Sequence, residues 1–193
     1  DDFIFDNDGF SNEITMSTED ATAYAGIVIP LAGSSTVNQV SVFNISTAAV
    51  DTKIAGFSQF GSLYSNNPTY ELDVTLEPGW NDVAVDWAFN NSYIVAHQFS
   101  FDFAAALDES AAPSVASHVL FAGSGWDDVT SALSGLGVDG EWGVRANVSF
   151  DGAGVTYNVY LDGVLDASNA GVSDNSATVE NLTNNVSYTF TVS

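Results

Sequence analysis

The run Tyr70-Glu-Leu-Asp-Val-Thr-Leu-Glu77 alternates apolar and polar residues with a period of two. Successive side chains of an extended strand point to opposite faces, so the apolar residues share one face and the polar residues share the other. One face of this strand should therefore pack on a core while the other meets water. Pro78-Gly79 then leads into a second alternating run, from Val83 to Phe89. We expect the two runs to form a β-hairpin.

The same alternation extends outward through most of the chain. It predicts further strands at residues 24–29, 37–46, 93–103 and 142–150, the first two separated by Pro30 and a turn at residues 32–35. The only expected helical turn spans residues 126–133. Short strands at a spacing of roughly ten residues, with Gly, Asn and Pro between them, are typical of a β-sandwich or jelly roll. The pattern therefore predicts an all-β protein.

Composition indicates a secreted or surface-displayed protein. The 193 residues include 13 Phe, 7 Tyr and 4 Trp, which is enough apolar material for a core. Against 25 acidic residues stand two bases, Lys53 and Arg145, for a formal net charge of −23. This charge repels nucleic acid and anionic membranes, so we expect no nucleic acid partner and no membrane insertion. The sequence has no cysteine, so packing rather than disulfides must stabilise the fold.

The C-terminal segment resembles fibronectin type III domains. The resemblance rests on Tyr-Asn-Val-Tyr-Leu-Asp-Gly at residues 157–163, and on Leu182 followed by Tyr188, Phe190 and Val192. It implies that the Tyr188 hydroxyl bonds back to the backbone near Leu182. Neither a separate first strand nor a last strand is visible, although residues 146–150 can stand in for the second. The resemblance therefore implies an incomplete sandwich with an open edge.

The remainder of the chain resembles jelly-roll accessory domains of secreted bacterial and archaeal peptidases and surface proteins. The matching motifs are Asp6-Asn-Asp-Gly-Phe10, Pro78-Gly-Trp-Asn81 and Gly140-Glu-Trp-Gly-Val-Arg145. This resemblance implies an extracellular, non-catalytic module. We therefore expect a jelly-roll-like β-sandwich at residues 1–145 and a smaller fibronectin-III-like or Ig-like β-sandwich, lacking an edge strand, at residues 146–193. No linker rich in Pro or Ser separates them.

No residue pattern indicates catalysis, so we expect a non-enzyme with no catalytic residues. His97 alternates with Val95 and Phe99, which favours a core position over a metal or catalytic role. Asp6 and Asp8 offer oxygen donors before Gly9 and resemble half of a calcium loop. A solvated turn is the alternative for these two carboxylates, so the expected cofactor is none, with calcium left open.

Tryptophans and sequons supply further candidates. Trp80 and Trp126 lie at expected turns, where an indole ring either stacks on a sugar or folds back to close the end of the sandwich. Trp87 and Trp142 alternate with aliphatic residues and should lie in the core. Glycans are a possible modification, because five Asn-X-Ser/Thr sequons occur, at Asn44, Asn90, Asn147, Asn181 and Asn185.

The open edge predicts assembly. An unpaired strand either aggregates or is completed by another segment. We expect a donor strand formed by Phe3, Ile4 and Phe5 to pair with the acceptor edge of the next subunit, giving a head-to-tail homopolymer, either a fibre or a surface layer. The residues of this acceptor edge are Val186, Tyr188, Phe190 and Val192. There are two alternatives to this strand exchange. Residues 3–5 pair within their own sheet, or the chain was trimmed before its final strand. The main functional alternative is a carbohydrate- or surface-binding accessory module of a larger secreted enzyme.

Overall fold

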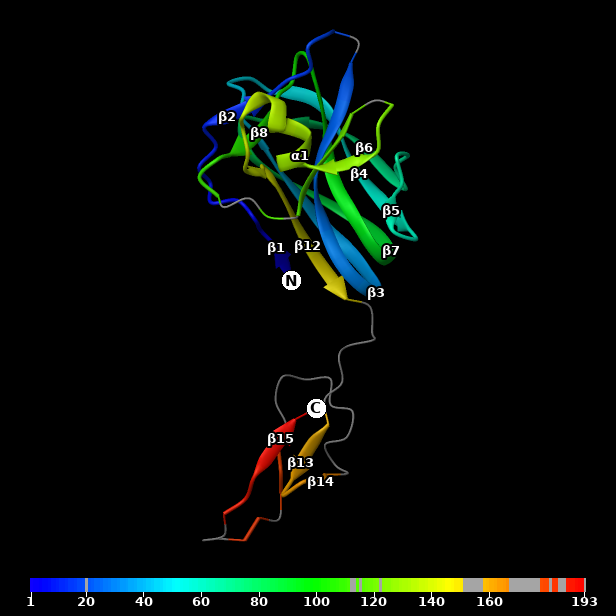
Figure 1. Ribbon diagram of the computed structural model, residues 1–193, viewed down its shortest axis with the longest axis vertical. Coiled ribbons are helices and arrows are strands. Elements are labelled where there is room, and N and C mark those ends of the chain that lie inside the picture. The colour runs from blue at the N-terminus through cyan, green and yellow to red at the C-terminus, as the bar shows by residue number, and fades with distance from the viewer. Residues whose placement is uncertain are drawn as a thin grey trace. The chain divides into compact units, whose positions relative to one another are not determined.

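The chain folds into two compact units, Asp1–Ser149 and Phe150–Ser193, which are described separately (Figure 1). The prediction of an all-β protein is confirmed, because strands make up most of the first unit, where they pack as a sandwich, and the described residues of the second unit include a small antiparallel sheet. The computed structural model describes residues 1–19, 21–111, 114, 116–121, 123–150, 158–166, 178–180, 182–183 and 187–192.

Two long strands organise the first unit. β3 (Thr22–Asn44) and β7 (Gly79–Ser100) pair antiparallel along their whole length, from Thr22 opposite Ser100 to Asn44 opposite Gly79 (Figure 1). The remaining strands of this nine-stranded sheet add to the two sides of this pair, and they are β1 (Asp2–Phe3), β12 (Val144–Phe150), β9 (Ser117–Phe121), β10 (Trp126–Asp128), β4 (Val50–Phe60), β5 (Leu63–Tyr64) and β6 (Tyr70–Leu76).

A second, three-stranded sheet completes this unit. Its strands are β11 (Glu141–Trp142), β8 (Ala105–Asp108) and β2 (Asn12–Ile14), in that spatial order. One turn of helix, α1 (Val129–Leu133), and a 3₁₀ turn, η1 (Ser134–Leu136), follow β10. The expected helical turn at residues 126–133 is therefore confirmed for its second half, while its first half continues as a strand.

Two expectations about strand connection are wrong, and the first is the hairpin. The runs at residues 70–77 and 83–89 do not form a hairpin, since β6 pairs with β4 while β7 pairs with β3 and β4. Tyr70 instead meets β7 through its side chain, because its ring stacks on Trp87 at 5.7 Å between ring centroids. A period of two shows which face of a strand is apolar, but it does not identify the neighbouring strand.

The expected turn at residues 32–35 is a bulged part of one strand. β3 runs through it, with register shifts between Ile29 and Ala32 and between Ala32 and Ser35. Gly33 adopts φ 125° there, a backbone conformation that favours glycine. A bulge bends the strand without ending it, so the sheet can curve around the core.

The core lies against the inner face of the curved sheet. Trp142 is fully buried and Trp87 is nearly so, which confirms the core positions predicted for both. His97 is also fully buried, which is the core position among the core and rim positions expected for it, and its ring lies 5.4 Å from that of Phe103. A separate apolar cluster lies outside the main core and is called here the outer-face cluster; its buried members are Ala55, Phe57, Ile94, Ala96 and Leu120, with Tyr24, Val28, Tyr64 and Trp126 packed against them.

The second unit contains a small antiparallel sheet. Its strands β14 (Val164–Leu165), β13 (Val159–Leu161) and β15 (Phe190–Val192) lie in that order. The Tyr188 hydroxyl accepts a hydrogen bond from the backbone N–H of Thr183 at 2.9 Å, so the predicted bond to the backbone near Leu182 is present.

The boundary between the units follows Ser149 rather than residue 145. β12 continues through the expected boundary, and its Ala146 and Asn147 pair with β1. Residues 146–149 thus complete the sheet of the first unit, so they are not available as a strand of the second. The alternation in a long run such as residues 142–150 does not show which unit its last residues belong to.

Candidate functional site

The predicted donor strand is paired within its own chain at Phe3, where β1 ends. Phe3 lies opposite Ala146 in β12, and the Asp1 amino group donates to the Val148 carbonyl at 2.7 Å. Phe3 and Phe5 pack against the main core, whereas Ile4 is 53% exposed. Pairing within its own sheet, one of the alternatives left open by the sequence, is therefore observed at Phe3.

The predicted calcium ligands Asp6 and Asp8 are bound by Arg145. The guanidinium donates to Asp6 through Nε at 2.9 Å and Nη2 at 2.5 Å, and Nη2 also lies 2.6 Å from Asp8. Hydrogen bonding to Asp6 raises the pKa of Arg145, so its positive charge is secure. The guanidinium occupies carboxylate oxygens of both residues that a calcium ion would require, and the described residues contain no cluster of three or more His, Cys, Asp or Glu that could hold a metal ion.

Trp80 closes the end of the sandwich over this ion pair. Its Nε1 donates to Asp8 at 2.9 Å, and the Arg145 guanidinium lies 3.9 Å from the centre of a Trp80 ring. Phe10 and Phe43 pack against the indole. The half-buried Trp80 ring is therefore in contact with Arg145, Phe10 and Phe43 of the protein itself.

Two buried carboxylates were not singled out from the sequence. Burial raises the pKa of Asp108, but hydrogen bonds from Ser110, Asn7 and Gly9 outweigh it and lower the pKa to about 2. Asp108 thereby fixes the loop that carries Asp6 and Asp8. The signal available in the sequence was Ser110 two residues later, a spacing typical of an Asx turn. Glu141 likewise accepts hydrogen bonds from the Ser117 hydroxyl and the Ser114 N–H.

The imidazole of His97 is enclosed in the core. Its Nδ1 donates to the Gln98 carbonyl at 3.1 Å, while its Nε2 is buried without a partner among the described residues. Burial lowers the pKa of His97 to about 4, so the ring is neutral near pH 7. This neutral ring has a packing role.

The predicted acceptor edge is described only in part. Phe190 and Val192 lie on β15 at one end of its three-stranded sheet, and they are 50% and 62% exposed. Tyr188 is half-buried beside them, with its hydroxyl engaged by Thr183. Val186 lies outside the described residues.

The sequons differ in accessibility. Asn44 is buried, and its Nδ2 donates to the carbonyls of Ala48 and Leu76, so the prediction of a glycan there is wrong. Asn147 is half-buried and bridges Asn38 and Asp2. Asn90 is exposed. The sequons at Asn181 and Asn185 begin outside the described residues.

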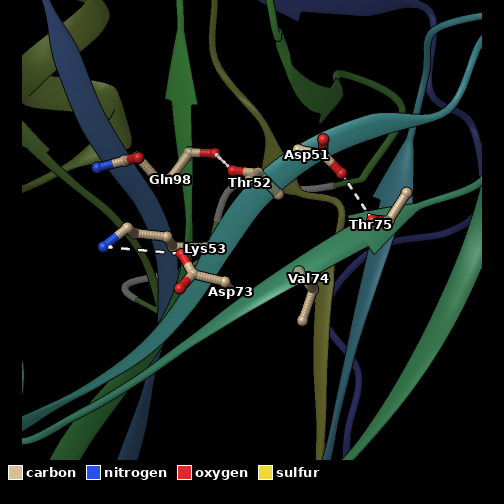
Figure 2. Close-up of a pocket in the computed structure, with 7 residues that line it drawn as sticks. All are labelled: Asp51, Thr52, Lys53, Asp73, Val74, Thr75 and Gln98. Carbon is tan, nitrogen blue, oxygen red and sulfur yellow. Dashed lines mark hydrogen bonds and ion pairs between the residues drawn. The ribbon is translucent and has the colours of Figure 1, made fainter.

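A polar hollow lies over β4 and β6 (Figure 2). Its volume is about 320 Å³. Lys53 is 2.5 Å from Glu71 and 3.8 Å from Asp73, and Thr75 donates to Asp51 at 2.6 Å. Several polar side chains of this hollow thus bond to neighbouring groups, and the described residues that line it include no aromatic side chain on which a ligand ring would stack.

An aromatic pocket lies over the outer-face cluster, between β10 and the segment at residues 62–66, a loop that includes the two-residue strand β5. It is called here the Trp126 pocket, and its volume is about 480 Å³. The loop contributes Tyr64 and Asn66 to the wall, and the opposite side contributes Trp126 and His118. Trp126 packs edge-on against Phe57 at 4.9 Å between ring centroids. Its Nε1 donates to the Ser65 carbonyl at 2.9 Å, which ties β10 to the loop.

Polar groups remain available around the Trp126 pocket. Asn66 donates through Nδ2 to the Ser124 carbonyl at 2.7 Å, and a side-chain amide has a second N–H and an acceptor oxygen besides. His118 Nδ1 donates to the Ala116 carbonyl at 3.2 Å, and the imidazole ring has a second nitrogen, Nε2, besides. Trp126 is the sequence candidate whose surroundings fit ligand binding. Tyr64, Asn66 and His118 were missed, because they join Trp126 only through the fold.

Comparisons with protein-family models, curated proteins and solved structures gave no match to this chain. In the described part of the chain, helices are too short to cross a membrane. The geometry of the Trp126 pocket and of β15 therefore carries the functional argument.

Proposed function

We propose that the protein is a non-enzymatic extracellular binding module that holds a neutral carbohydrate in the Trp126 pocket. The observation that carries this proposal is the meeting of Trp126 and Tyr64 with the Asn66 amide in one pocket of about 480 Å³. Aromatic rings offer flat apolar surface to a sugar ring, and a few fixed polar groups give orientation.

Charge supports a neutral ligand. The described walls of the Trp126 pocket include neither a carboxylate nor a Lys or Arg side chain. The two bases of the chain are engaged elsewhere, Lys53 with Glu71 and Arg145 with Asp6. A net charge of −23 repels anions, and a cation would find no counter-charge in this pocket.

The structural roles of the polar groups support a non-catalytic module. Asp6, Asp8 and Asp108 fasten the N-terminal loop, and Glu141 fastens Ser117. His97 is enclosed in the core. The extracellular setting is part of the proposal and rests on the acidic composition.

Calorimetric titration with neutral oligosaccharides tests this function. The probes are gluco-, manno-, xylo- and N-acetylglucosamine oligosaccharides. We expect binding by the natural chain and a loss of about tenfold or more in Trp126→Ala. Tyr64→Phe should weaken binding less, because it keeps the ring. The matched control is Phe60→Ala, since Phe60 is 71% exposed near the same loop and outside the pocket.

A loss of binding in a variant can be distinguished from misfolding of that variant. Each variant is first compared with the natural chain by circular dichroism and thermal unfolding. If no probe binds the natural chain, or if folded Trp126→Ala and Tyr64→Phe both bind as the natural chain does, the carbohydrate function is rejected.

A second candidate function is a structural subunit that polymerises head to tail by strand complementation. The observation that favours it is β15, an edge strand among the described residues whose Phe190 and Val192 are at least half exposed. A donor strand from Phe3–Phe5 would first have to leave β12. Electron microscopy should then show filaments that Val192→Lys disperses, because a charge on the edge strand disfavours edge-to-edge pairing. Monomers at every concentration would exclude this candidate.

A further inference from the structure

A smaller pocket adjoins the Trp126 pocket across Asn66. Its volume is about 210 Å³, and Asn66 lines both pockets. Thr22, Leu120 and Ser124 form part of its wall, together with Tyr24. Leu120 and Tyr24 belong to the same outer-face cluster as Trp126. The two pockets therefore lie next to each other over one apolar cluster.

The Asn66 side chain lines both pockets and bonds to Ser124 in the wall of the smaller one. Asn66 belongs to the loop that follows β5, and Ser124 lies between β9 and β10. The 2.7 Å bond from Asn66 Nδ2 to the Ser124 carbonyl joins these segments. A ligand that crosses from one pocket to the other passes the remaining donor and acceptor of the Asn66 amide.

The two pockets differ in volume and in the polar groups that their walls offer to a ligand. Ligand pockets commonly measure roughly 300–1,000 Å³, so the Trp126 pocket is large enough alone and the smaller pocket is suited only to extending it. The hydroxyl of Tyr24 is already used, since it donates to Glu71 at 3.0 Å. Thr22, by contrast, is exposed at the smaller pocket and offers a hydroxyl.

We propose that the two pockets together bind an extended, unbranched neutral glycan, with the first two sugar units at Trp126 and the following units crossing Asn66 into the smaller pocket. This inference rests on the carbohydrate function proposed above. The larger pocket supplies the aromatic surface and thus most of the affinity. The smaller pocket adds contacts that only a longer chain reaches, so it makes binding depend on chain length.

The test is a titration series from disaccharide to hexasaccharide within each neutral oligosaccharide class. We expect affinity to rise about tenfold along the series that binds and then to reach a plateau. Thr22→Trp fills the smaller pocket, so hexasaccharide affinity should fall to the disaccharide level while disaccharide affinity stays unchanged. The matched control is Thr47→Trp, an equally bulky change at an exposed position outside both pockets.

The possible results separate this inference from the proposed function. If oligosaccharides bind through Trp126 but with equal affinity at all lengths, and Thr22→Trp has no effect, the extended site is overturned while the carbohydrate function stands. If disaccharide and hexasaccharide are weakened equally by Thr22→Trp, the smaller pocket does not act as a separate extension. If no oligosaccharide binds at all, both proposals fail together.

Discussion

Arg145 and Asp6 form a two-bonded ion pair that joins residues 139 positions apart in the sequence. The Asp6 side chain is completely buried beneath the guanidinium. The pair ties the N-terminal loop to β12, the strand with which β1 also pairs. One long-range contact thus accounts for three features of the sequence: an acidic loop, one of only two bases, and the Trp80 turn that covers them.

Removal of the Arg145 guanidinium should destabilise the fold strongly. Arg145→Ala leaves the buried Asp6 carboxylate without its partner, a change that costs about 3 kcal/mol or more. Arg145→Lys should recover only part of this loss, because an ammonium cannot form both bonds of the planar guanidinium. Urea unfolding measures both variants. Lys53→Ala is the matched control, since its ion pair is exposed and should contribute little. Equal effects of Arg145→Ala and Lys53→Ala would contradict this account.

Acid should destabilise the protein through His97. Its folded pKa of about 4 lies below the ordinary value of 6.5, so the unfolded chain takes up the proton first. Stability should therefore fall as the pH drops from about 6.5 towards 4, by up to roughly 3 kcal/mol, and then level off for this group. The unfolding free energy measured across this range should fall less steeply with decreasing pH in His97→Leu than in the natural chain, because the variant has no imidazole to protonate. An unchanged pH dependence in His97→Leu would refute the assignment.

Asp108 should act in a separate, lower window of pH. Its folded pKa of about 2 is below the ordinary value of 3.8, so its stabilising effect is complete above that ordinary value. The effect should be lost as the pH falls from 3.8 towards 2. Asp108→Asn should therefore show a lower melting temperature at pH 6 and a smaller further loss in strong acid. A variant that keeps the full loss in strong acid would show that other carboxylates cause it.

The Tyr188 hydroxyl should stabilise the second unit. Tyr188→Phe removes the bond from the Thr183 N–H and leaves the ring in place, which should cost about 1 kcal/mol. Chemical unfolding of the full chain, followed by a probe of the second unit, gives this value. No loss of stability would mean that water replaces the hydroxyl without cost.

Salt should stabilise the whole chain, and chelation should not matter. The 25 carboxylates repel one another with only two bases to offset them, and salt screens this repulsion. The melting temperature should rise from low to moderate ionic strength. Adding a chelator at constant ionic strength should leave it unchanged, because Arg145 already occupies oxygens of Asp6 and Asp8. A drop on chelation would reveal a structural cation.

Much of the fold was predictable because the alternation of apolar and polar residues depends only on neighbouring positions in the chain. Alternation with a period of two predicted the strands around Tyr70 and Val95, and it placed Trp87, His97 and Trp142 in the core. The hairpin between residues 70–77 and 83–89 was wrong, since the partner of a strand depends on all the strands competing for its edges. The candidate site was predictable only at Trp126.

The sequence by itself determined the all-β class, the aromatic core and the acidic surface, because each follows from residue type and spacing. Only the tertiary structure decided which groups meet. It placed Arg145 between Asp6 and Asp8, closed Trp80 over that pair, and turned Asn44 inward. It also brought Tyr64 and His118 to Trp126. These contacts join segments far apart in the chain, and no local periodicity contains information about them.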